Sequence, residues 1–161
     1  MSDPLVAHFE SSLQCGNGCY YCYAVGYQSM RKGNAAAVEK ASEEKLVNAT
    51  RAKALQLIEK MMKIKETAVT DMLPEMHFSM SSDFLGPDVP TQTRAYIVMR
   101  EWLDMGLLCS CVTKGVPKDA ELRAKFLALM KQHPEAVSFQ CTYVFFLVFK
   151  KNFFSDFFLF F

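Results

Sequence analysis

Short apolar segments alternate with amphipathic stretches along this chain. The short segments occupy residues 5–9, 75–80, 107–112 and 137–143, and turn or loop residues bound them. Segments of this length and composition are typical of strands. The last three follow one another at intervals of roughly 30 residues, with helical patterns between them, which indicates βαβ units and a parallel sheet.

Three helices are expected between these strands, and each has a candidate capping residue. The first carries apolar residues at helical spacing from Val47 to Ile64, the second begins after Pro90 and ends at Gly106, and the third stops before Pro134. The candidate caps are Ser42 for the first helix, Thr91 or Thr93 for the second, and Asp119 for the third.

The expected topology brings three loops to one edge of the sheet. The carboxyl ends of parallel strands share an edge, and binding sites form there. A cysteine-rich loop follows the first strand, Ser82 and Asp83 follow the second, and Lys114 follows the third. Because right-handed crossovers turn successive strands the same way, the predicted fold class is α/β, with a parallel sheet that curls toward an open or a closed barrel.

The composition predicts one folded domain without a strong charge bias. Of the 161 residues, 51% are hydrophobic and 22% charged, which suffices for a packed core and excludes intrinsic disorder. Basic residues number 18 and acidic residues 17, so the formal net charge is +1. A dedicated nucleic-acid-binding protein would use a long-range attraction that this balance removes. No charged segment precedes an apolar one at the start, so we expect no secretory signal and an intracellular protein.

Residues 144–161 differ in composition from the rest of the chain. They contain nine of its 14 phenylalanines and show no helical or strand period, because nearly every position is apolar. A membrane helix needs about 20 mostly apolar residues, and two lysines, an asparagine and an aspartate interrupt this segment. We therefore expect no membrane anchor. Our hypothesis is that residues 1–143 form the domain and that the tail is a read-through intron or frameshift product, as translated AT-rich DNA would yield.

The strongest chemical signal is a cluster of three cysteines after the first strand. Cys15, Cys19 and Cys22 are spaced C-x3-C-x2-C, with Gly16 and Gly18 allowing a tight turn. In a chain without an export signal, clustered thiols indicate metal ligands or redox groups. Iron–sulfur clusters are held by cysteine thiolates, normally four. Three thiolates on a four-iron cluster would leave one iron open to a substrate or cofactor.

This spacing, with an aromatic residue just before the third cysteine, resembles the cluster motif of the radical S-adenosylmethionine enzymes. Three blocks of sequence resemble the spore photoproduct lyase-like branch of that superfamily. They are Cys-Tyr-Tyr-Cys-Tyr at 19–23, Met-Ser-Ser-Asp-Phe-Leu-Gly at 80–86, and Val-Thr-Lys at 112–114. The resemblance extends over roughly residues 5–143, and the cysteine motif has the strand context that the family requires. It implies a partial parallel (β/α) barrel of about six units, of which this chain contains about four.

The resemblance implies a cofactor pair and a role for each matching residue. A [4Fe-4S] cluster would be held by the three cysteines, and S-adenosylmethionine would bind its open iron. Ser82 and Lys114 would contact the methionine part, and Asp83, in the same block as Ser82, would also bind the cofactor. Tyr21 and Tyr23 match tyrosines beside the cluster, and Tyr23, the expected catalytic residue, would lie near the adenosyl group.

The implied reaction is reductive cleavage of S-adenosylmethionine to methionine and a 5′-deoxyadenosyl radical. The electron would come from a reductant such as a flavodoxin or ferredoxin, and the cofactor would do the chemistry while the protein positions it. DNA is a partner that the resemblance implies, but the near-neutral charge does not support it.

Two departures from the family pattern bear on function. Met80 stands where spore photoproduct lyase has a hydrogen-donating cysteine, and a thioether has no S–H to give, so DNA dimer repair by that route is not expected. The sequence also predicts only four barrel strands. A truncated barrel leaves an unpaired edge and an unshielded radical site, so we expect this chain as it stands to be inactive.

A non-catalytic alternative is a zinc-binding fragment in which His8 or His77 completes the site of the three cysteines. The simpler expectation for both histidines is a structural role beside the sheet. Cys109 and Cys111 lie two residues apart on one face of the third strand, and we expect them to pack in the core.

Overall fold

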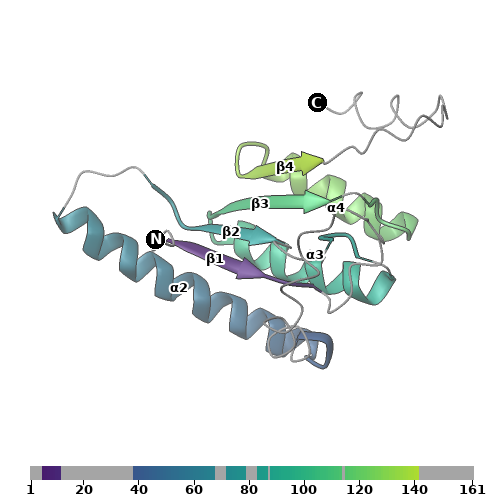
Figure 1. Cartoon of the computed structure of the whole chain (residues 1–161), viewed down its shortest axis with the longest axis horizontal. Coiled ribbons are helices and arrows are strands. Elements are labelled where there is room, and N and C mark those ends of the chain that lie inside the picture. The colour runs from purple at the N-terminus through teal and green to yellow at the C-terminus, as the bar shows by residue number, and fades with distance from the viewer. Residues whose placement is uncertain are drawn as a thin grey trace, which may run out of the picture.

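A computed structural model describes residues 5–11, 38–67, 72–78, 83–86, 88–113 and 115–141, and the side chains within these ranges up to residue 138. Strands and helices alternate along the described chain, as the sequence predicts (Figure 1). The elements are β1 (Val6–Phe9), α2 (Glu43–Thr67), β2 (Glu75–Phe78), α3 (Val89–Asp104), β3 (Leu108–Thr113), α4 (Ala120–Gln132) and β4 (Val137–Cys141).

The four strands form one parallel sheet whose spatial order, β1-β2-β3-β4, is also their order in the chain. Phe9 of β1 is opposite Phe78 of β2, which is opposite Cys111 of β3. The α/β class and the parallel sheet are therefore confirmed. Each crossover moves the chain one strand further in the same direction, so the described strands contain no reversal of order of the kind that marks doubly wound folds.

The three helices form a single layer on one face of the sheet. α2 packs against α3, and α3 packs against both α4 and β3 (Figure 1). Residues that alternate along the strands point into this layer, and Ala7, Met76 and Cys109 are almost fully buried. Their neighbours on the other face are more accessible, with His8 exposed and His77 partly so. No helix of the described ranges covers that second face.

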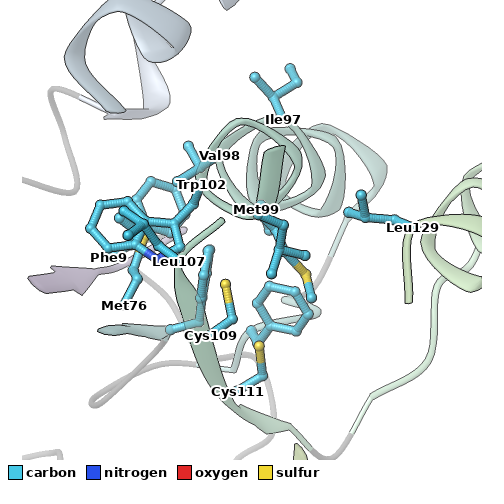
Figure 2. Close-up of a cluster of buried hydrophobic side chains, with 14 of the residues drawn as sticks. Phe9, Met76, Ile97, Val98, Met99, Trp102, Leu107, Cys109, Cys111 and Leu129 are labelled. Atoms are coloured by element: carbon cyan, nitrogen blue, oxygen red, sulfur yellow. The ribbon is translucent and has the colours of Figure 1, made fainter. Parts of the chain in front are cut away.

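The core lies between α3 and the helix-facing side of the sheet (Figure 2). Trp102 is completely buried there, and its indole Nε1–H donates to the backbone carbonyl of Leu108 at 2.8 Å. This bond satisfies the one polar atom of a side chain whose burial stabilises the fold through its large apolar area. Cys109 and Cys111 point from β3 toward α3 and are also buried. Their expected place in the core is confirmed.

A chain of edge-to-face aromatic contacts runs through the core toward the carboxyl ends of the strands. The ring centroids of Phe9 and Phe78 are 5.3 Å apart, those of Phe78 and Phe84 are 5.1 Å apart, and those of Phe84 and Phe126 are 5.7 Å apart. Such pairs add to the stabilisation from area burial. Phe84 lies in the described segment 83–86 after β2, and its burial anchors that segment, which also contains Asp83.

Two of the expected helix caps are confirmed. The Ser42 hydroxyl accepts the N–H of Lys45 at 3.3 Å, and the Asp119 carboxylate accepts the N–H of Leu122 at 2.8 Å. Gly106, with φ of 75°, terminates α3 as predicted.

The expected cap of α3 was wrong. Asp88 is the cap, and Thr91 instead donates its N–H to the Asp88 carboxylate at 2.8 Å. The helix begins before Pro90, because a proline in the first turn lacks only an N–H that would have no helical partner there.

Candidate cofactor site at the strand ends

The carboxyl ends of β1, β2 and β3 lie at one edge of the sheet. This follows from the parallel pairing and from the register that aligns Phe9, Phe78 and Cys111 across the three strands (Figure 1). The three segments singled out by their sequence therefore leave the sheet at the same edge. We call the four buried polar side chains that join the strand ends the strand-end network: Ser11, Asp83, Gln92 and Thr113.

Asp83 is the centre of this network. Asp83 is only 4% exposed. Its Oδ1 accepts hydrogen bonds from the Thr113 hydroxyl at 2.6 Å and from the Leu85 N–H at 2.9 Å. The backbone joins the same two segments, because Phe84 N–H donates to the Val112 carbonyl at 3.3 Å. The segment after β2 is therefore bonded to the end of β3 through both a side chain and the main chain.

Ser11 joins the end of β1 to the same segment. It is completely buried, and its hydroxyl lies 3.4 Å from the backbone oxygens of both Asp83 and Phe84. Both contacts are long for an O–H donor, so each is weak, and one proton can serve only one of them at a time. Ser11 precedes Cys15 by four residues, and it is the last described residue before the cysteine motif.

Gln92 connects the network to the helices. Its Nε2 donates to the backbone oxygens of Leu85 and Gly86 at 3.1 and 3.2 Å, and its Oε1 accepts the Lys118 N–H at 3.0 Å. A completely buried amide that uses both of its ends in this way joins α3, the segment after β2 and the approach to α4.

Two glycines allow these segments to approach closely. A Cβ on Gly115 would lie 3.0 Å from the Leu85 backbone oxygen, and a Cβ on Gly86 would lie 2.7 Å from Cγ2 of Thr91. Any larger residue would therefore push the segments apart.

Asp83 is the one predicted site residue that the structure describes. Its carboxylate accepts hydrogen bonds from the Thr113 hydroxyl and the Leu85 N–H, so it has a structural role in joining the strand ends. The remaining predicted site residues lie outside the described ranges: Cys15, Cys19, Cys22, Tyr21, Tyr23, Ser82 and Lys114. Met80 and the tail at 144–161 also lie outside them.

Sequence reasoning missed Ser11, Gln92 and Thr113 as parts of this edge. Thr113 lies in the Val-Thr-Lys block, so the sequence indicated that this segment matters, but it did not indicate that Thr113 bonds to Asp83. Gln92 gave none, because a polar residue in the first turn of a helix is ordinarily exposed to solvent.

The accessible face of the sheet carries His8 and His77 side by side. Their ring centroids are 5.6 Å apart, and His77 Nε2 lies 3.2 Å from a carboxylate oxygen of Glu75. The described ranges contain no group of three or more histidine, cysteine or acidic side chains arranged to hold a metal ion.

Burial makes Cys109 and Cys111 unsuitable as thiolate ligands. Desolvation raises the pKa of both thiols well above the ordinary value, and the nearby Glu75 adds to the effect. They also face the helix layer, on the opposite side of the sheet from His8 and His77.

Comparison of the chain with protein-family models, curated proteins and solved structures found no match. Among the described helices, none combines the length and the hydropathy that a membrane span requires.

Proposed function

We propose that this chain is the core of a radical S-adenosylmethionine enzyme of the spore photoproduct lyase-like type. One observation carries the proposal. The strands that precede the cysteine motif, the Ser-Asp block and the Thr-Lys block are consecutive neighbours in a parallel sheet, so all three segments leave from one edge. Ligands bind at this edge in α/β folds.

The arrangement of the layers supports a partial barrel as the architecture. The strand order is sequential and the helices cover one face, as in (β/α) barrels. Doubly wound sheets place helices on both faces, and their strands are apolar on both sides. Here the face away from the helices carries the polar residues His8, Glu75, His77 and Ser110 together with the apolar residues Val6, Leu108 and Val112. In the proposed barrel this mixed face would line the interior, where its polar side chains would be available to a polar substrate.

The residues fit the proposed cofactors by donor type. Cys15, Cys19 and Cys22 would hold a [4Fe-4S] cluster, for which thiolates are the normal protein ligands. When bound, the cluster supplies the electron that cleaves the sulfonium of S-adenosylmethionine. Lys114 would pair its ammonium with the methionine carboxylate, and Ser82 would donate a hydrogen bond to the same part of the molecule.

The tyrosines of the cysteine motif would contact the cofactor, and buried polar residues at the strand ends would support the site. Tyr21 and Tyr23 would flank the bound nucleotide, with Tyr23 beside the adenosyl group. Three members of the strand-end network, Ser11, Asp83 and Thr113, would hold the surrounding segments in place. Met80 provides no S–H, so the proposal includes no hydrogen transfer from that position.

Anaerobic reconstitution of the full chain with iron and sulfide tests the cluster. We expect charge-transfer absorption at about 400 nm and iron and sulfide in equal amounts. Cys22→Ala should lose this absorption. Cys111→Ala is the matched control and should retain it, because Cys111 is a buried core residue.

Two results would count against the proposal. One is identical absorption in Cys22→Ala and the unmodified protein, which would show that Cys22 is not a ligand of the cluster. The other is stoichiometric zinc in protein purified without oxygen, which would favour the non-catalytic metal-binding fragment. If the cluster forms, we expect no 5′-deoxyadenosine on reduction with dithionite in the presence of S-adenosylmethionine, because the truncated barrel leaves the site unshielded; its formation would overturn the expected inactivity and leave the cluster assignment standing.

A further inference from the structure

We infer that Asp83 is a positioning residue that sets the affinity for S-adenosylmethionine through Thr113 without touching it, an inference that rests on the proposed function. The hydrogen bonds of the Thr113 hydroxyl carry it. The Thr113 oxygen lies 2.6 Å from Oδ1 of Asp83 and 3.4 Å from the Gly115 carbonyl. A hydroxyl has one proton, and the shorter contact to a carboxylate is the stronger bond.

Because the hydroxyl donates to Asp83, its lone pairs are free to accept. Gly115 N–H donates to the same oxygen at 3.0 Å. The Asp83 carboxylate thus orients the Thr113 hydroxyl, and the hydroxyl in turn holds the Gly115 amide. Thr113 and Gly115 are the two covalent neighbours of Lys114. Asp83 therefore fixes the chain on both sides of the residue proposed to bind the methionine carboxylate.

The packing around Gly115 makes this attachment rigid. The position of a Cβ on Gly115 is 3.0 Å from the Leu85 backbone oxygen and 3.6 Å from Oδ1 of Asp83. Asp83 and Thr113 are both nearly inaccessible to water. In such surroundings a charge-assisted hydrogen bond is stronger than at the surface, and a broken one cannot be replaced by water.

The local and the long-range bonds of Asp83 can be separated by substitution. Its bond to Leu85 N–H, two residues along the chain, is an Asx turn and would shape the segment after β2 by itself. Its bond to Thr113 spans 30 residues. Of the two Asp83 bonds, Thr113→Val removes only the second, and with it the acceptor of Gly115 N–H. It keeps the branched shape that suits a strand and leaves the Asx turn intact.

The test measures equilibrium binding of S-adenosylmethionine to the cluster-loaded full chain, by dialysis without reductant so that no cleavage occurs. We expect Thr113→Val to raise the Kd about tenfold while absorption at about 400 nm per protein is unchanged. Thr113→Ser should restore the affinity, because it restores the hydroxyl. Hydrogen exchange of the peptide containing Gly115 should be faster in Thr113→Val, because that amide loses its acceptor.

Thr50→Val is the matched control. Thr50 is also a buried threonine, and its hydroxyl donates to the Leu46 carbonyl at 2.8 Å within α2. This variant removes a buried hydroxyl far from the strand ends and should change neither the Kd nor the exchange at Gly115.

The outcomes separate the two proposals. If the unmodified, cluster-loaded protein binds no S-adenosylmethionine, the proposed function fails. If it binds and Thr113→Val binds equally well, Asp83 and Thr113 only stabilise the fold and this inference alone is overturned.

Discussion

Glu101 joins two helices of the covering layer through a pair of arginines. Its Oε2 accepts the Nε–H of Arg51 from α2 at 2.8 Å, and Nη2 of Arg51 lies 2.8 Å from the same oxygen as an ion pair. Its Oε1 accepts Nε and Nη2 of Arg100 at 3.2 and 2.9 Å. The Glu101 side chain is 8% exposed, whereas Arg51 is 58% exposed and Arg100 is 33% exposed. The buried carboxylate therefore needs the arginines to solvate its charge, whereas water can solvate the arginines if the contact is lost.

Glu101→Gln should lower the free energy of unfolding by about 2 kcal/mol, the range for charge-assisted bonds to a buried group. Glutamine keeps the size of the side chain, but its amide nitrogen would face the donors of one arginine. The cost is below that of a fully buried pair, because water can solvate Arg51, and Arg100 Nη2 also lies 3.7 Å from Glu43.

The pH dependence has a defined sign. Burial alone would raise the pKa of Glu101, but the hydrogen bonds and charges of Arg100 and Arg51 together lower it below its ordinary value. The stabilisation is therefore fully present above the unfolded-state pKa of about 4.3 and is lost as the pH falls through the lower folded-state pKa. The difference between Glu101→Gln and the unmodified protein should shrink under those acidic conditions.

Urea denaturation at neutral and acidic pH measures both effects. Glu121→Gln is the control, because Glu121 forms an exposed pair with Lys125 at 2.7 Å on α4. That substitution should destabilise the protein much less than Glu101→Gln, because water screens a pair whose partners are both exposed. Equal destabilisation by the two substitutions at neutral pH would refute the reasoning that the buried carboxylate joins α2 to α3.

Three further results are expected. Gly115→Ala should destabilise the protein in urea by about 1–3 kcal/mol, because its Cβ would lie 3.0 Å from the Leu85 backbone oxygen; an unchanged midpoint would contradict the close approach. Asp88→Ala should cost about 1 kcal/mol in thermal unfolding, because α3 loses its cap, and a cost near zero would return the cap to a threonine. Iodoacetamide at mildly alkaline pH should leave Cys109 and Cys111 unmodified in the native protein, since burial raises the pKa of both thiols; rapid alkylation detected by mass spectrometry would contradict their burial.

The sequence by itself determined the features that depend on near neighbours. The caps at Ser42 and Asp119 each bond to an amide three residues away, and Gly106 ends α3 through its own backbone conformation. Short apolar segments and helical periods located β1–β4 and α2–α4 to within a few residues, whereas residues 38 and 39, expected in a loop, are helical. These signals are local, so they can be recognised without knowing how the chain folds. The predicted cap of α3, Thr91 or Thr93, was wrong because the prediction required the helix to start after Pro90, whereas the helix starts at Val89 with Asp88 as its cap.

Only the tertiary structure decided which residues meet at the strand ends. Asp83 and Thr113 are 30 residues apart, and Ser11 and Asp83 are 72 apart. Their contacts exist because three parallel strands pair side by side in one register, so that residues distant in the chain reach the same end of the sheet. The same applies to Glu101, whose partner Arg51 lies 50 residues away on another helix. A buried polar residue is stable only with its distant partner in place, so its role emerges from the packed fold and not from its position in the chain.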